Sequence, residues 1–125
     1  MEIHIIEQFF SICKLEDLSR VDWSSPFCFL CKTDEEMSLV CETADVPPNT
    51  VARDDGWRAF RIQGILDFSL IGILSRISAI LAEEGIGIFA VSTYNTDYIF
   101  TKAECFSKAI TALEKEGSGF YGKSQ

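Results

Sequence analysis

The stretch DFSLIGILSRISAILAEEGIGIFAVSTYNTDYIF, residues 67–100, decides the fold. Its first half carries apolar residues at the spacing of one helix face, which predicts a helix over 69–84. The residues of this apolar stripe are Leu70, Ile73, Leu74, Ile77, Ile80 and Leu81. Ser69 is a suitable N-cap for such a helix, and Gly85 is suited to the position just after its end.

The segments around this helix complete a known order of elements. Residues 57–64 mix aromatic and β-branched residues with charges and predict a half-exposed strand. Residues 86–94 predict a largely buried strand, and 97–102 predict its antiparallel neighbour after a short turn. A second amphipathic helix is expected over 103–116, with Phe106, Ala109, Ile110 and Leu113 on one side. The order β-α-β-β-α is that of an α+β, ferredoxin-like fold, although the remaining GFY offers only a very short last strand.

The N-terminal half has the same order of elements in a compressed form. Residues 4–15 predict a strand, and 16–23 have room for a turn or two of helix. The runs at 26–33 and 37–43 predict a hairpin, and 44–56, with its prolines, predicts a loop with room for one helical turn.

We therefore predict two ferredoxin-like βαββαβ units in tandem. The reduced one occupies residues 1–56 and the fuller one residues 57–125. The loop 44–56 is the seam, and the two units are expected to share one sheet edge or one core.

Charge and hydropathy exclude several classes of partner. The 11 basic residues are scattered and the net charge is −8, so the phosphate backbone of a nucleic acid would be repelled. The first residues lack the basic region of a secretory signal. No apolar run reaches the roughly 20 residues needed to cross a bilayer. These features predict a cytoplasmic protein without a nucleic-acid or membrane partner.

The five cysteines do not form a recognisable metal or redox motif. An odd number of cysteines without a signal peptide indicates reduced thiols. Cys28 and Cys31 lie three residues apart in a predicted strand, so their side chains face opposite sides and cannot share a zinc ion or a disulfide. His4 is the single histidine. We therefore expect no metal and no cofactor, and we interpret the cysteines as small buried apolar residues.

Two polar segments are candidates for a ligand site. The segment 64–72, which enters the first helix, offers unpaired backbone N–H groups that suit a carboxylate. In that segment Asp67 can accept hydrogen bonds, and Gly72 lets a ligand approach closely. In the turn after the next strand, Asp97 could pair with an ammonium group while Thr93 or Asn95 adds hydrogen bonds. Together they would form an amino-acid clamp.

Each of these residues also has a purely structural interpretation. Asp67 and Ser69 are common helix caps, and Asn95 and Asp97 are common turn formers. Gly72 has a packing explanation in a first helical turn. From residue types and spacing alone, the structural interpretation is the stronger one.

Several motifs resemble those of a known family. They are LDFSLIGIL (66–74), AEEGIGIFAVSTYNTDYIF (82–100) and, more weakly, HIIEQFFSICKL (4–15) followed by WSSPFCFLCKTDEEMSLVC (23–41). The chain resembles ACT-domain proteins, in particular small bacterial two-module ACT proteins related to the animal cytosolic arginine sensor. The resemblance implies βαββαβ units that act in regulation and bind amino acids where two domains pair.

The resemblance also implies where the ligand lies. It places the site between the loop before the first helix and the STYNTD turn. The implied contacts are Asp67, Ser69, Leu70, Ile71, Gly72, Thr93, Asn95 and Asp97. Asp97 aligns with an acidic ligand contact and is the first choice for an ammonium group or a basic side chain. The chain departs from the family after Gly117, where the closing strand is short, so either the N-terminal half or a second chain must continue the sheet.

Three functions remain open from the sequence. The leading one is a non-catalytic regulatory module that responds to an amino acid, with a basic or zwitterionic ligand favoured over an acidic one. A second is an assembly module that has kept the scaffold without the pocket. The third is a small enzyme using Asp67 and Asp97 as acid and base, which lacks a nucleophile–base pair because His4 is remote in sequence. A homodimer is expected under the first two, and the regulated partner would be an enzyme or a transporter.

Overall fold

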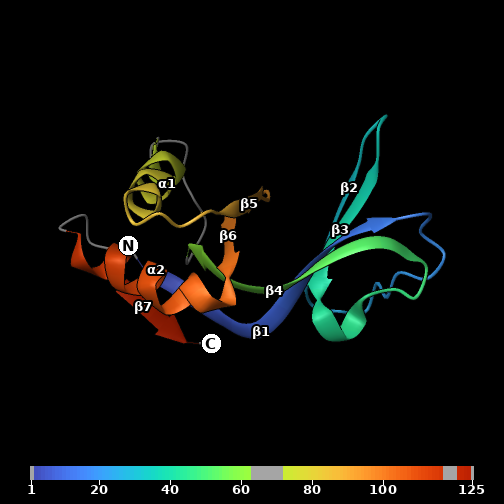
Figure 1. The fold of residues 1–125 in the computed structure, drawn as a ribbon, viewed down its shortest axis with the longest axis horizontal. Coiled ribbons are helices and arrows are strands. Elements are labelled where there is room, and N and C mark those ends of the chain that lie inside the picture. Colours follow the sequence, from blue (N-terminus) through green and yellow to red (C-terminus); the bar gives the residue numbers. More distant parts are fainter. Residues whose placement is uncertain (1, 63–71, 117–120, 125) are drawn as a thin grey trace. The chain divides into compact units, whose positions relative to one another are not determined.

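The computed structural model describes residues 2–62, 72–116 and 121–124 of the chain. It is a mixed α+β structure with two helices and a largely antiparallel sheet (Figure 1). The chain forms two compact units, one made of Met1–Glu7 and Arg58–Gln125, the other of Gln8–Trp57. Two long strands, β1 (Glu2–Leu15) and β4 (Thr50–Ile62), contribute residues to both. No helix within the described ranges is long and apolar enough to span a membrane.

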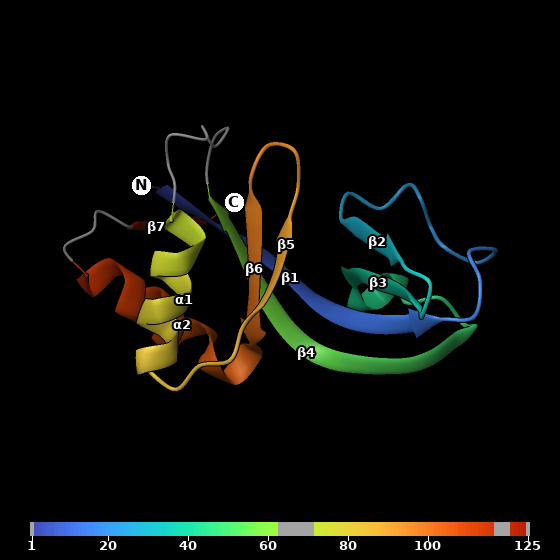
Figure 2. The same cartoon turned by 90° about the horizontal axis from the view of Figure 1, so that it is seen from above.

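The larger unit has two helices packed on strands in the order β1–β4–β6–β5. Its other elements are α1 (Ile73–Glu83), β5 (Phe89–Ser92), β6 (Asp97–Lys102), α2 (Ala103–Lys115) and β7 (Tyr121–Ser124). Figure 2 shows β5 and β6 as a hairpin beside β4. From β4 to α2 the element order agrees with the predicted β-α-β-β-α pattern.

The core of this unit lies where the apolar stripes of both helices meet one face of the sheet. Ile73, Ile77 and Leu81 of α1 are buried, which confirms the predicted stripe for its described part. The buried residues of α2 are Phe106, Ala109, Ile110 and Leu113, the four expected from the sequence. Phe60 and Ile62 of β4 and Ile99 of β6 face them in the same cluster.

The C-terminal end of α1 agrees with the prediction, whereas the N-cap predicted at its other end is not among the described residues. At the C-terminal end, Gly85 has φ of 72° and its N–H donates to the Ala82 carbonyl, while the Ile86 N–H donates to the Leu81 carbonyl. This is a Schellman motif, and it confirms the predicted role of Gly85. At the other end Gly72 occupies the N-cap position and the helix begins at Ile73. The predicted cap Ser69 lies outside the described residues.

Strand β5 is shorter and more exposed than predicted. The sequence indicated a largely buried strand over 86–94, whereas β5 covers Phe89–Ser92 and alternates between half-buried and exposed residues. The reason is its position at the end of the strand order, where, among the described strands, it pairs with β6 alone.

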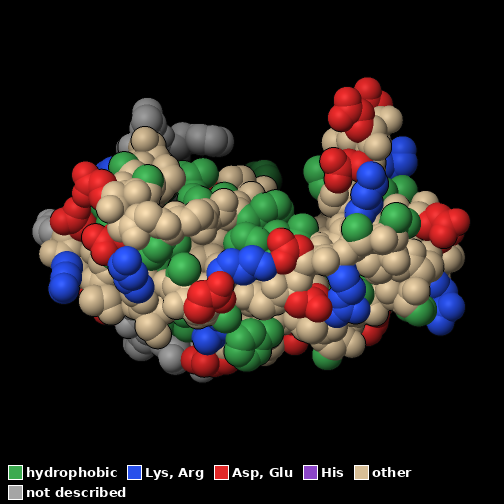
Figure 3. All heavy atoms as spheres, in the orientation of Figure 1, with side chains coloured by type: hydrophobic (Ala, Val, Ile, Leu, Met, Phe, Trp, Pro, Cys, Tyr) green, Lys and Arg blue, Asp and Glu red, His purple; other side chains and the backbone are tan. Residues whose placement is uncertain are grey.

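The smaller unit has the strand order β2–β3–β1–β4 and almost no helix. The predicted hairpin is present as β2 (Cys28–Lys32) and β3 (Met37–Glu42), followed by the short 3₁₀ helix η1 (Thr43–Asp45). Cys13, Leu15, Leu39 and Cys41 form its buried cluster. Carboxylates gather at the hairpin tip, where Asp34, Glu35 and Glu36 are all exposed (Figure 3).

Two predictions for this unit are wrong. Residues 16–23 form no helix, because the carboxylates of Asp17 and Asp22 accept hydrogen bonds from the N–H and hydroxyl groups of Ser19 and Ser24. Such local bonds compete with helical ones. Most of the predicted loop 44–56 is strand, since β4 begins at Thr50, beside β1.

The two hairpins correspond in their hydrogen bonds and their registers. Thr33 donates its N–H to the Glu36 carbonyl, and Thr93, 60 positions later, donates its N–H to the Thr96 carbonyl. The strands that follow, β3 and β6, have the same succession of half-buried and buried residues.

The neighbours of β1 account for the short C-terminal strand. In the larger unit β1 lies beside β4, and β7 pairs with Glu2–Ile5 of β1 in a parallel arrangement. Of the two sources proposed for sheet continuity, the N-terminal part of the same chain therefore supplies the strand next to β4.

Candidate functional site

The turn between β5 and β6 is held by a compact set of hydrogen bonds. The Thr93 hydroxyl donates to the Thr96 carbonyl (3.0 Å) and accepts from the Thr96 N–H (3.3 Å). The Thr93 N–H donates to the same carbonyl (2.8 Å). Thr93 therefore acts as a turn former, and Tyr94 and Asn95 are left exposed at the tip of the hairpin.

Thr96 attaches this turn to the end of the neighbouring strand. Its buried hydroxyl donates to the carbonyl oxygen of Ile62 at 2.8 Å. Ile62 is the last residue of β4, directly before the segment that leads to α1. Figure 2 shows the turn and this end of β4 at the same end of the sheet. The bond therefore ties the hairpin turn to the end of β4, whereas Gly72, the described residue of the segment 64–72, lies at the start of α1.

Asp97 begins β6 directly after the turn, with its side chain half-buried. It lies opposite Ser92 in the strand register, and its Oδ1 accepts a 2.6 Å hydrogen bond from the Ser92 hydroxyl. This bond orients the carboxylate at the rim of the hairpin. A carboxylate oriented in this way can accept further hydrogen bonds from an ammonium or guanidinium group.

Gly72 marks the other end of the segment between β4 and α1. Its φ of 86° is left-handed, a conformation that glycine adopts without strain. Its carbonyl accepts the first helical bond of α1, from the Arg76 N–H. Apart from its chain neighbours and the backbone of its own helix, no atom of the described residues lies within 4 Å of the position that a Cβ would occupy. A glycine at this position is therefore explained by the left-handed backbone conformation.

Four of the eight predicted site residues, Asp67, Ser69, Leu70 and Ile71, lie outside the described residues. The other four are Gly72, Thr93, Asn95 and Asp97. Of these, Thr93, Asn95 and Asp97 belong to one hairpin end, and Gly72 begins α1.

Sequence reasoning missed two features near this hairpin. It did not assign Thr96, because the direction of its hydroxyl depends on strand pairing. It also did not assign Arg61, whose Nη1 donates to the Tyr98 hydroxyl at 3.2 Å and whose guanidinium lies 5.8 Å from the centre of the Tyr98 ring. The signal available in the sequence was an arginine inside the predicted strand 57–64.

The part of the chain that the structure describes holds no group of three or more His, Cys, Asp or Glu side chains able to bind a metal ion. The hairpin itself carries hydrogen-bonding hydroxyl groups on Ser92 and Thr93 and the carboxylate of Asp97.

Comparison with known proteins supports the fold and places the chain in a family. The family model described as "ACT domain" matches residues 52–115. No curated protein matches.

Solved structures resemble most of the chain. A crystal structure of a protein from Agobacterium tumefaciens is 26% identical, with a TM-score of 0.85, over 99% of this chain and 92% of that one. A Vibrio cholerae protein of unknown function, described as a possible transport protein, is 18% identical with a TM-score of 0.69, over 89% of this chain and 85% of that one.

An aspartate kinase from Clostridium acetobutylicum, described as an allosteric enzyme, resembles this chain over about a third of the kinase's length. It is 13% identical with a TM-score of 0.63, over 85% of this chain and 32% of the kinase. The last two likenesses concern the fold alone. With the family model matching more than half of its length, the chain belongs to the ACT-domain family.

Proposed function

We propose that this protein is a regulatory module that binds a small amino acid and carries out no chemistry on it. ACT domains are generally regulatory, small-molecule-binding modules, which favours this class of function. The observation that carries the proposal is the bond from the Thr96 hydroxyl to the Ile62 carbonyl. It fixes the turn that precedes Asp97 to Ile62, the last residue of β4.

In the proposed site the two segments bind opposite ends of the ligand. The backbone N–H groups before α1, with Asp67, Ser69, Leu70, Ile71 and Gly72, would receive the α-carboxylate. Asp97, oriented by Ser92, would receive the ammonium group or a basic side chain, and Thr93 and Asn95 would complete the rim. We propose that the site lies where two ACT units pair, in a cytoplasmic homodimer that regulates an enzyme or a transporter.

We further propose that the two units of this chain are tandem ACT modules, the N-terminal one reduced, of the type related to the arginine sensor. Three correspondences support this: the strand order of each unit, the Thr33 and Thr93 turns, and the burial of β3 and β6. The reduction consists of η1 in place of a helix like α2, and a loop in place of α1.

The test is a thermal-shift screen of the full chain against the common amino acids at millimolar concentration. A ligand that binds only the native state adds about 2.7 kcal/mol at a hundredfold excess over Kd. We expect one or two amino acids to raise the melting temperature. Asp97→Asn should abolish the shift, because it keeps an acceptor for Ser92 but removes the charge.

The matched control is Asp34→Asn, which removes the same charge from the exposed tip of the other hairpin. It should leave the shift intact. An Asp97→Asn protein that responds like the wild type would refute Asp97 as the ligand contact. Ligand binding itself would still stand, and its contacts would then have to be mapped on other residues.

A second candidate function is assembly without a ligand. The specific observation in its favour is that β5 ends the order of the described strands, because a strand at the end of a sheet is a site where another chain can pair. A dimer that gives no thermal shift with any amino acid would favour this function over ligand binding.

A further inference from the structure

Three thiols gather on one face of the smaller unit. Cys13 on β1 and Cys41 on β3 are buried, each 2% exposed, and half-buried Cys28 on β2 packs against the same cluster. Cys31, three residues further along β2, points to the opposite side and is exposed. The three strands are neighbours in the order β2–β3–β1, so the cluster crosses the hairpin onto the long strand.

The register selects one pair of these thiols as disulfide partners. Cys28 lies directly opposite Cys41. At the turn, the bond from the Thr33 N–H to the Glu36 carbonyl makes Thr33 and Glu36 a hydrogen-bonded pair. Bonded and non-bonded pairs alternate along an antiparallel ladder, so Cys28 and Cys41 form a non-bonded pair.

The spacing of such a pair suits a disulfide. The Cα atoms of a non-bonded pair lie about 4.5 Å apart, and their side chains approach each other more closely than in a bonded pair. Disulfides join Cα atoms about 4.4–6.8 Å apart. The backbone of the hairpin therefore already has the spacing that a Cys28–Cys41 bridge requires.

Cys13 also contacts Cys41 but occupies a diagonal position. In the β1–β3 register Cys41 lies opposite Ser11, and Cys13 lies opposite Leu39. Diagonal Cα atoms are about 7–8 Å apart, beyond the reach of a disulfide without backbone movement.

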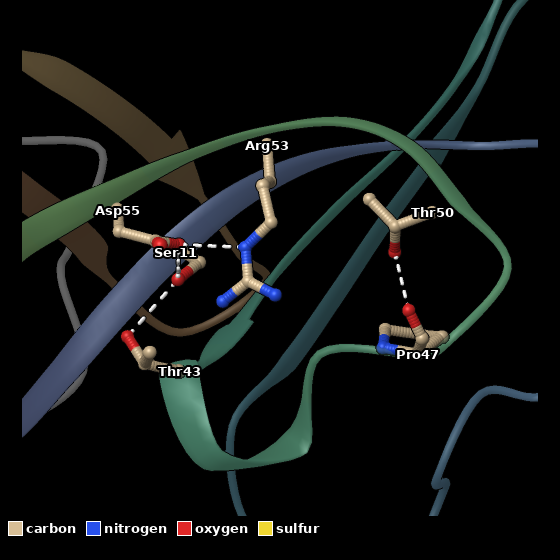
Figure 4. A network of polar contacts seen from close by, with 6 residues as sticks. All are labelled: Ser11, Thr43, Pro47, Thr50, Arg53 and Asp55. Carbon is tan, nitrogen blue, oxygen red and sulfur yellow. Dashed lines mark hydrogen bonds and ion pairs between the residues drawn. The ribbon is translucent and has the colours of Figure 1, made fainter.

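Charges and hydrogen bonds distinguish the thiols further. The thiols of Cys13 and Cys41 share a hydrogen bond in which the Cys41 S–H donates, and this bond lowers the pKa of Cys13. The positive charge of Arg53 also lowers that pKa, whereas burial raises it. The same bond, together with burial, raises the pKa of Cys41. Figure 4 shows Arg53 in the adjoining polar network, where its Nε lies 3.1 Å from Asp55 and the Ser11 hydroxyl donates to the same carboxylate.

We propose that Cys28 and Cys41 are a thiol modification site, which forms a disulfide across the β2–β3 hairpin on reaction with a low-molecular-weight disulfide such as glutathione disulfide. The Cys28 thiolate attacks glutathione disulfide, forming a mixed disulfide and releasing one glutathione. The Cys41 thiolate then attacks the sulfur of Cys28 and releases the second glutathione. Each glutathione thiolate takes one cysteine proton, so two protein thiols are oxidised and one glutathione disulfide is reduced.

Access and rate follow from the position of β2. β2 is the last strand of its sheet, and Cys28 is half-buried, so an external disulfide can reach Cys28 before Cys41. Burial raises the pKa of Cys28, and the bond to Cys13 together with burial raises the pKa of Cys41, so the thiolate fraction of both attacking groups is low. We therefore expect a slow reaction that must be followed to equilibrium.

The test is oxidation of the full-length Cys31→Ser variant in glutathione buffers of increasing disulfide content. In this variant every cysteine lies in its own tryptic peptide: Cys13 in 1–14, Cys28 in 21–32, Cys41 in 33–53 and Cys105 in 103–108. We expect the intact protein to lose two hydrogen atoms. Digestion under non-reducing conditions should join 21–32 to 33–53.

The matched comparison is Cys28→Ser, which changes the same strand and should lose the intramolecular bridge completely. Circular dichroism would establish that both variants are folded. A bridge between 1–14 and 33–53, a stable glutathione adduct on Cys28 without a bridge, or no oxidation at any ratio would each overturn the proposal. A covalent dimer in place of the intramolecular bridge would overturn it as well.

Discussion

Thr96 and Asp97 are adjacent in the sequence, yet they have different roles in the structure. The Thr96 hydroxyl is buried and bonded to a main-chain carbonyl of another strand. The Asp97 carboxylate is at the rim and bonded to a side chain of its own hairpin. Thr96 positions the turn, and Asp97 is the residue that we propose as the ligand contact.

Replacing Thr96 should therefore weaken the fold. In Thr96→Val the volume is kept, but the Ile62 carbonyl loses its buried donor, which costs about 1–3 kcal/mol of unfolding free energy. Chemical denaturation would measure the loss. Thr111→Val, an exposed change on α2, is the control and should stay within about 0.5 kcal/mol. Equal stability of the two variants would show that the Thr96 bond contributes nothing.

At the scale of elements, α1 ends because Gly85 adopts a left-handed conformation. Gly85→Ala should destabilise the protein by about 1–2 kcal/mol, since a Cβ is strained at this φ although space is open around it. Gly87→Ala, two residues later, is the control, because Gly87 has an ordinary φ and equally open space. Thermal unfolding of both variants measures the difference, and no difference would contradict the Schellman end of α1.

Strand β5 provides a test of edge pairing. Because the Thr93 N–H points toward β6, the alternation of the ladder directs the Ala90 N–H away from β6. Ala90→Pro removes an outward donor and keeps the hairpin bonds, so it should dissociate a dimer formed through β5. Light scattering coupled to size exclusion would measure the mass. A wild-type monomer, or a dimer unchanged in Ala90→Pro, would contradict pairing through this edge.

The sequence predicted most helices and strands, but it missed features that depend on which strands lie next to each other. Periodicity identified α1 and α2 with their buried residues, and turn residues identified both hairpins. The exposure of β5 was wrong because a run of apolar letters does not say whether a strand lies at an edge. The strand at Thr50 was missed because Arg53, Asp54 and Asp55 look like loop residues.

At the scale of the whole chain, the first residues belong to the unit that contains both helices. Ile3 is fully buried in the core cluster formed by α1, α2, β4 and β6. Ile3→Ala should cost about 2–5 kcal/mol. Hydrogen exchange should detect the loss as reduced protection of the amides in α1 and α2.

Lys14→Ala is the control for Ile3→Ala, because it changes an exposed residue at the other end of β1. It should leave exchange in both helices unchanged. Full protection of α1 and α2 in Ile3→Ala would mean that this unit does not need the N-terminal strand.

The sequence by itself determined the class of fold, the two helices, both hairpins and the polar residues at the tip of the second one. These are local properties, fixed by periodicity, turn chemistry and caps within a few residues of each other. Only the tertiary structure decided that β1 lies beside β4, that the Thr96 hydroxyl reaches Ile62, and that Cys28 faces Cys41. Each of these depends on strand order and register, which come from burying apolar faces against residues distant in sequence.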